Sequence, residues 1–192
     1  MSEAAATFEQ RGKLTRNAAL ASVAVASILL LLKAYALWRT QSVAVLGSLA
    51  DTTLDLVASV VTLLGVHWAA QPADEQHRYG HGKAEALASL FQVTLIGMAA
   101  LGLAGESIHR LMTGVHSTAG ASEGIGVSLI AIVLSLALVL YQKRVIARTG
   151  SLAIGTDNLH YKSDFYLNLS VIVALVLDQY LRISGADALF GV

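Results

Sequence analysis

The sequence predicts an all-α membrane protein, a bundle of five full helices and the start of a sixth, and three observations support this. Of its 192 residues, 55% are hydrophobic and only 14% are charged, against roughly 25% charged residues in an ordinary soluble domain. Four long segments contain no Asp, Glu, Lys or Arg: 17–32, 56–73, 86–105 and 124–142. Their apolar residues do not alternate with the period of two that a barrel strand requires. Because a bilayer admits only helices and closed barrels, these segments are expected to be helices.

The expected helices follow one another with short connections. We place them at about 17–38, 43–70, 83–112, 123–148 and 151–182, each long enough for the ~20 residues that cross a bilayer core. A secretory signal is the competing interpretation of the first segment, because basic residues precede it. The apolar run continues to Ala36 without an obvious small-residue cleavage site, which favours a membrane helix.

Residues 183–192 resemble a turn followed by the first residues of a sixth apolar helix. We therefore expect a single transmembrane domain over 1–192 that stops inside its last helix, since about twenty residues would be needed to span.

Composition excludes several other classes. The chain contains no Cys, which excludes a disulfide framework, a zinc finger and a cysteine nucleophile. Its 13 basic and 13 acidic residues leave no excess positive charge, so nucleic-acid binding is not expected.

The distribution of Lys and Arg predicts a cytoplasmic N-terminus. With that orientation, eight basic residues fall on the cytoplasmic side and three on the other side, a clear positive-inside bias. The eight are Arg11, Lys13, Arg16, Arg78, Lys83, Lys143, Arg144 and Arg148, and the three are Arg39, Arg110 and Arg182. The segment 71–82 is then a cytoplasmic loop.

Two of the apolar helices contain ionisable residues that are expensive to bury. Asp51 and Asp55 are four residues apart, as are His160 and Asp164, so each pair lies on one helix face. A charge at mid-membrane costs ~2.5–3.5 kcal/mol on insertion scales and marks a functional site by default. Brought together, the pairs offer three carboxylates and one imidazole, a tetrahedral set suited to Zn²⁺, Fe²⁺, Mn²⁺ or Co²⁺. The competing interpretation is a buried polar network in which an Asp pairs with Lys162.

The cytoplasmic loop contains a second candidate cluster. Asp74, His77 and His81 have the spacing of metal ligands. Gly80 and Gly82 would allow the tight backbone that turns both imidazoles inward. A solvated polar loop is the alternative.

These residues together resemble the cation diffusion facilitator family, especially its bacterial zinc and ferrous-iron efflux pumps. The resemblance rests on both helical pairs and on the loop segment Gln71-Pro-Ala-Asp-x-x-His-x-x-Gly-His-Gly-Lys-Ala-Glu85, and it extends to Phe190. It implies a six-helix transmembrane domain that exports divalent metal from the bacterial cytoplasm in exchange for protons. It assigns the transport site to Asp51, Asp55, His160 and Asp164, and a loop site to Asp74, His77 and His81.

The resemblance has further implications. An Asp at position 51 resembles members that accept several metals, so Zn²⁺ or Fe²⁺ are expected, with Cd²⁺, Mn²⁺ and Co²⁺ as further candidates, and no organic cofactor. Members usually form homodimers. The family's C-terminal cytoplasmic domain and most of its sixth helix have no counterpart in these 192 residues. Lys83 matches a lysine that forms an ion pair near the family's dimer interface.

Two other functions compete with transport. An intramembrane metallohydrolase would need an open metal position and a separate general base, and the helical His-Glu-x-x-His motif is absent from the sequence. A metal-binding membrane sensor or an inactive fragment would bind metal without moving it. We expect a secondary active transporter rather than an enzyme.

Overall fold

The computed structural model describes residues 3–40, 43–113 and 121–181, and within these ranges the chain forms five long helices and no strand. They are α1 (Glu3–Thr40), α2 (Val43–Ala69), α3 (Lys83–Thr113), α4 (Ala121–Thr149) and α5 (Leu152–Leu181). The predicted all-α bundle is confirmed, with helix ends close to those expected for α2 to α5. The segment expected to start a sixth helix, 183–192, lies outside the described residues.

The first helix begins much earlier than predicted, at Glu3 instead of about residue 17. The predicted start was placed where the charged residues give way to the apolar segment. Charged residues mark the end of an apolar segment, but a helix can continue through them. Residues 3–16 contain strong helix formers and no Pro. Lys13 also pairs with Glu9 one turn earlier, with 2.6 Å between Lys13 Nζ and Glu9 Oε1. This stretch is therefore a polar extension of a membrane helix.

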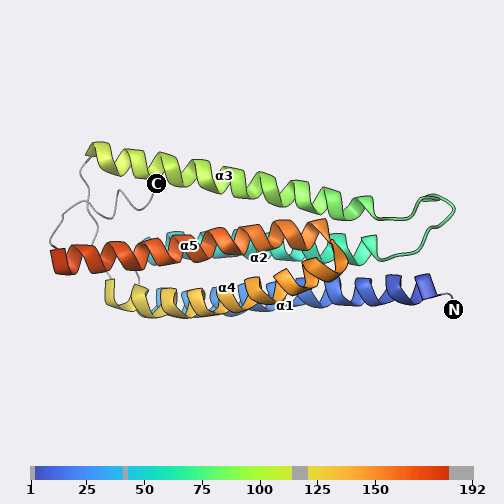
Figure 1. Ribbon diagram of the computed structural model, residues 1–192. Helices are drawn as coiled ribbons and strands as arrows, with labels where there is room; N and C mark the ends of the chain where they lie inside the picture. The colour runs from blue at the N-terminus through green and yellow to red at the C-terminus, as the bar shows by residue number, and fades with distance from the viewer. Residues whose placement is uncertain (1–2, 41–42, 114–120, 182–192) are drawn as a thin grey trace.

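The helices run side by side along one long axis (Figure 1). α1 packs against α2 and α4, α5 packs against α4 and α3, and α2 contacts α1, α3 and α5. The 70–82 connection and the α4–α5 turn lie at the same end of the bundle as the start of α1 (Figure 1). α2 and α5, which contain the intramembrane candidates, contact each other inside the bundle.

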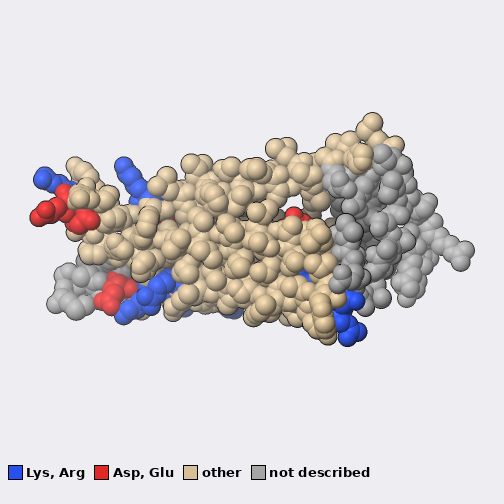
Figure 2. All heavy atoms as spheres, turned by 180° about the vertical axis from the view of Figure 1, so that it is seen from behind, with Lys and Arg blue, Asp and Glu red and all other residues tan. Residues whose placement is uncertain are grey.

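The outer surface is suited to a membrane. Among the described residues, four segments are long and apolar enough to cross a bilayer: Glu9–Arg39, Leu46–Ala69, Lys83–Gly105 and Gly126–Thr149. Figure 2 shows described Lys, Arg, Asp and Glu side chains mostly toward the ends of the bundle, with an almost uncharged stretch between them. Acidic atoms are also visible inside an opening in that apolar stretch (Figure 2). The chain is a multi-pass membrane protein.

A compact turn between α4 and α5 fixes where α5 begins. Gly150 has a φ of 65°, a left-handed conformation that favours glycine, and its N–H donates to the Ile146 carbonyl at 2.8 Å. Ser151 caps α5 by accepting the Ile154 N–H at its hydroxyl. Glu85 of α3 accepts hydrogen bonds from the Ser151 hydroxyl and the Leu152 N–H. The ionisable segment of α5 starts one turn after this anchored end.

At the loop end of the bundle, α2 and α3 approach closely at a glycine. A Cβ added at Gly65 would lie 2.5 Å from the Ala88 Cβ and 3.1 Å from the Ala84 carbonyl oxygen. Small residues at such a crossing let membrane helices pack by backbone contact. This contact fixes the helix ends that the 70–82 connection joins.

Candidate metal centres

Inside the bundle, three of the four predicted intramembrane residues come together. His160 Nε2 lies 3.1 Å from Asp55 Oδ1 and 3.7 Å from Asp164 Oδ2. One ligand atom from each residue lies within 4.8 Å of the others. The His160 side chain is 11% exposed, and the two carboxylates are about a quarter exposed, at 25% and 24%. The cluster is thus mostly buried, with partial access at its carboxylates.

These distances fit the spacing of ligands around a small divalent ion. Carboxylate oxygens and imidazole nitrogens lie about 2.0–2.2 Å from a tetrahedral Zn²⁺, which places two ligand atoms roughly 3.3 Å apart. The observed separations of 3.1 and 3.7 Å bracket that value. Two carboxylates and one neutral imidazole suit divalent metals of the Zn²⁺, Fe²⁺ and Mn²⁺ kind.

Asp51, the fourth predicted member, does not join the close group. It lies one helical turn before Asp55 on α2 and its side chain is exposed, and its oxygens are not among the ligand atoms that lie within 4.8 Å of one another. The sequence pattern correctly puts both carboxylates on one helix face, but sharing a face does not fix the side-chain position. Three candidate ligands are therefore close together, and the fourth candidate lies one turn away.

A separate buried network lies one turn before His160 and centres on Asp157. This carboxylate is fully buried and accepts hydrogen bonds from Gln92 of α3 at 2.8 Å, Gln142 of α4 at 2.6 Å and the Ser22 hydroxyl of α1. The donors come from three different helices, so the Asp157 network (Ser22, Gln92, Gln142 and Asp157) joins α5 to α1, α3 and α4. It positions the segment of α5 that bears His160 and Asp164.

Sequence reasoning missed this network. We considered pairing with Lys162 for an intramembrane Asp, whereas Asp157 is bonded to Ser22, Gln92 and Gln142. Because these partners are uncharged, a search for charges in apolar segments passes over them. The available signal was two glutamines and a serine within membrane helices, since polar side chains there usually bond across helix interfaces.

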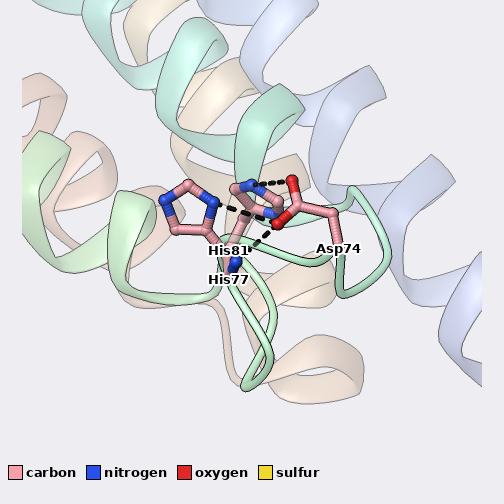
Figure 3. A group of neighbouring side chains, drawn as sticks. All are labelled: Asp74, His77 and His81. Carbon is pink, nitrogen blue, oxygen red and sulfur yellow. Dashed lines mark hydrogen bonds and ion pairs between the residues drawn. The ribbon is translucent and has the colours of Figure 1, made fainter.

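In the loop between α2 and α3, the structure brings all three predicted residues together. Asp74 Oδ1 lies 3.2 Å from His77 Nδ1, and Asp74 Oδ2 lies 3.5 Å from His81 Nε2. The two imidazole rings are 4.4 Å apart between centroids, and both lie against the Asp74 carboxylate (Figure 3). The ligand atoms fall within 4.8 Å of one another. Asp74 and His77 are exposed, with 51% and 55% of their side chains accessible.

Local backbone contacts hold the Asp74 carboxylate in place. Its Oδ1 accepts the N–H groups of Gln76 and His77, an Asx-turn arrangement. The His77 N–H, followed by the His77 side chain and the charges of the two imidazoles, holds the pKa of the Asp74 carboxyl below its ordinary value. Asp74 is thus an ionised acceptor over a wide pH range.

One of the two loop glycines has the predicted conformational role. Gly80 has a φ of 77°, which an L-residue rarely adopts, whereas Gly82 is not among the described glycines with positive φ. Among the described residues, His81 Nδ1 is a buried nitrogen without a hydrogen-bond partner. Such an atom is uncommon in native proteins.

Comparisons with known proteins agree with a transmembrane domain. Residues 19–192 match the family of the cation efflux transmembrane domain. The chain is 45% identical over 179 residues to the cation-efflux pump FieF of Klebsiella pneumoniae (strain ATCC 700721 / MGH 78578). It is 44% identical to that of Cronobacter sakazakii and 43% identical to that of Salmonella newport.

These alignments cover 93% of this chain and 59% of each relative, so the chain spans about three fifths of the length of these relatives. The family match covers nearly the whole chain and includes every residue of both clusters. The chain therefore belongs to the cation diffusion facilitator family and contains its cation efflux transmembrane domain.

Proposed function

We propose that this protein exports a divalent metal ion from the bacterial cytoplasm in exchange for protons. The observation that carries the proposal is the contact of Asp55 of α2 with His160 and Asp164 of α5 inside an apolar helix bundle. Ionisable groups in that position mark ion pathways and proton relays. The similarity to proteins named cation-efflux pumps supports the direction of transport.

In this proposal Asp51 supplies the fourth ligand. It lies one turn from Asp55 on α2, so a rotamer change or a small movement of α2 would bring a carboxylate oxygen toward the ion. Oxygen and nitrogen ligands accept Zn²⁺ and Fe²⁺, and also Cd²⁺, Mn²⁺ and Co²⁺. Four protein ligands leave no open position for a catalytic water, which favours a secondary active transporter over a metallohydrolase.

Proton exchange follows from the chemistry of the ligands. Metal and protons compete for the same lone pairs on imidazole and carboxylate, so binding one releases the other. His160 is the proposed proton carrier, since an imidazole nitrogen binds either a proton or a metal ion. Rocking of the helices would open the site to each side in turn.

The remaining assignments depend on this proposal. The protein would lie in the cytoplasmic membrane with its N-terminus inside, as the positive-inside bias favours. Asp74, His77 and His81 would then face the cytoplasm and capture metal at the entrance. We also propose that the protein works as a homodimer, as the family resemblance implies.

The proposal is tested with purified protein in sealed vesicles under an imposed pH gradient. Uptake of Zn²⁺ and of Fe²⁺ is measured for wild type, Asp55→Ala and His160→Ala. We expect gradient-driven uptake in wild type and its loss in both variants, because each change removes one of three converging ligands. His67→Ala is the matched control, since His67 is an exposed histidine on α2 and its loss should leave uptake unchanged.

Two other results would redirect the assignment. Tight metal binding by wild type without uptake would identify a sensor and contradict transport. Uptake that persists in Asp55→Ala and His160→Ala would show that the ion crosses elsewhere.

A further inference from the structure

Lys33 of α1 is a positive charge placed against the helix that contains the candidate transport site. A lysine in a membrane helix commonly extends its ammonium toward the membrane interface. In the structure it turns to α2, where Nζ donates to Thr52 Oγ1 at 2.6 Å and to the Ser48 carbonyl at 3.3 Å. The Thr52 hydroxyl donates in turn to the Ser48 carbonyl at 3.1 Å. The ammonium is thus attached to one turn of α2.

That turn also contains the candidate ligands. Thr52 follows Asp51 directly and precedes Asp55 by three residues. Lys33 lies close enough to interact electrostatically with the carboxylates of Asp55, Asp164 and Asp51. Thr52 is almost fully buried, at 2% exposure, and Lys33 is half-buried, so water screens these charges only partly.

Charge balance gives this lysine a specific role. Metal coordination requires ionised carboxylates and a neutral imidazole, so the three carboxylates and His160 then contribute a charge of about −3, and Lys33 reduces it to about −2. A divalent ion then makes the loaded site neutral, which is the favoured condition for charges away from water. Without Lys33 the loaded site would retain about one negative charge, and the empty site would attract a cation more strongly.

Resting on the proposed transport function, we infer that Lys33 is a built-in counter-cation of the intramembrane site. It offsets one carboxylate charge in both the empty and the loaded states. It thereby limits how tightly the site holds a divalent ion, and it makes the site neutral when an ion of charge +2 is bound. Tight binding would slow release, so a weaker site favours turnover. Lys33 acts through the field at the site and not as a ligand, since an ammonium has donors only.

The test separates the charge of Lys33 from its hydrogen bonds. Zn²⁺ affinity is measured by calorimetry in a His77→Ala/His81→Ala background, which removes the loop cluster from the titration. Lys33→Met removes charge and hydrogen bonds, Lys33→Gln retains a donor for Thr52 without the charge, and Lys33→Arg retains the charge. Lys13→Met is the matched control, because Lys13 is an exposed lysine of the same helix that pairs with Glu9.

We expect Lys33→Met and Lys33→Gln to bind Zn²⁺ at least about tenfold more tightly, because a repelling charge is removed from a poorly screened site. In vesicle transport both variants should show a lower KM together with a lower kcat. Lys33→Arg and Lys13→Met should remain near wild type. A merely structural role predicts the opposite: weaker binding in Lys33→Met and recovery in Lys33→Gln.

Each outcome decides a separate question. Unchanged or weaker Zn²⁺ binding in Lys33→Gln, with helical content retained by circular dichroism, overturns the counter-cation role while the transport proposal stands. Absence of Zn²⁺ binding in the background protein, before any change at Lys33, overturns the transport proposal and this inference together.

Discussion

The two candidate metal clusters have the same number of residues but are built in different ways. In the loop, Asp74, His77 and His81 are close in sequence, and backbone hydrogen bonds within the turn hold the carboxylate. In the membrane, Asp55 is 105 residues from His160, and the two meet only because α2 packs against α5. A movement of α2 against α5 would change the second cluster and leave the first intact. A transport site needs such a variable geometry, and a capture site does not.

This comparison predicts the largest effect for loss of an intramembrane ligand. His160→Ala should lower the rate of vesicle Zn²⁺ uptake by at least about a hundredfold, because in the proposed mechanism the imidazole is both a metal ligand and the proton carrier. His77→Ala/His81→Ala should lower it by no more than about tenfold at saturating metal. Initial uptake rates over a range of Zn²⁺ concentrations check both. Equal losses in the two variants would contradict the division of roles.

The second prediction concerns the support of the intramembrane cluster, which has no counterpart in the loop. Asp157→Ala should lower the free energy of unfolding by about 3 kcal/mol or more, because it leaves the buried amide donors of Gln92 and Gln142 without their carboxylate acceptor. Thermal unfolding in detergent, followed by near-ultraviolet circular dichroism, measures the loss.

Glu9→Ala is the control for Asp157→Ala. Glu9 is an exposed carboxylate with one ion pair, so its removal should change the midpoint temperature of thermal unfolding little. Similar midpoints for the two variants would mean that the Asp157 network does not hold α5.

Sequence predicted the fold well because membrane helices are determined by long uncharged segments. The expected 43–70 and 83–112 correspond to α2 at Val43–Ala69 and α3 at Lys83–Thr113. The start of α1 was wrong by about 14 residues, since helix formers continue beyond the apolar segment. The hydropathy of a sequence locates the segment that lies in the membrane, and it does not locate the first residue of the helix.

The sequence predicted those features of the candidate sites that follow from the periodicity of helices and turns. Spacings of four residues put Asp51 with Asp55 and His160 with Asp164 on shared faces, as found. Periodicity does not determine side-chain positions, so it did not indicate that Asp51 would stay outside the close group. Nor did it indicate that Lys33 would turn to Thr52. Both depend on which helices become neighbours.

A third prediction tests whether the loop cluster depends on its turn. Gly80→Ala forces a Cβ into a left-handed conformation, which costs about 1–2 kcal/mol. Metal affinity at the loop should fall about tenfold, while binding at Asp55, His160 and Asp164 is unchanged. Gly82→Ala is the matched control, since a Cβ there meets no atom within 4 Å and the residue has no positive φ. Calorimetry in an Asp55→Ala background isolates the loop cluster, and equal affinities for the two variants would show that the turn is adaptable.

The smallest effect concerns the pH dependence of the loop. The pKa of the Asp74 carboxyl is lowered chiefly by the His77 N–H. The ionised carboxylate therefore stabilises the folded loop at pH values above the pKa that Asp74 has in the unfolded chain. That contribution disappears only as pH falls through the lower folded pKa. Asp74 therefore remains ionised at about pH 5, so a loss of loop metal between about pH 7.5 and 5 would not come from protonation of this carboxylate.

We expect the ¹³C shift of the Asp74 carboxyl to stay constant over that interval while loop metal binding declines. Asp74→Asn should weaken binding at every pH in this interval, because it removes a candidate ligand charge that stays ionised throughout. A carboxyl shift that follows the decline would show instead that Asp74 gains the proton.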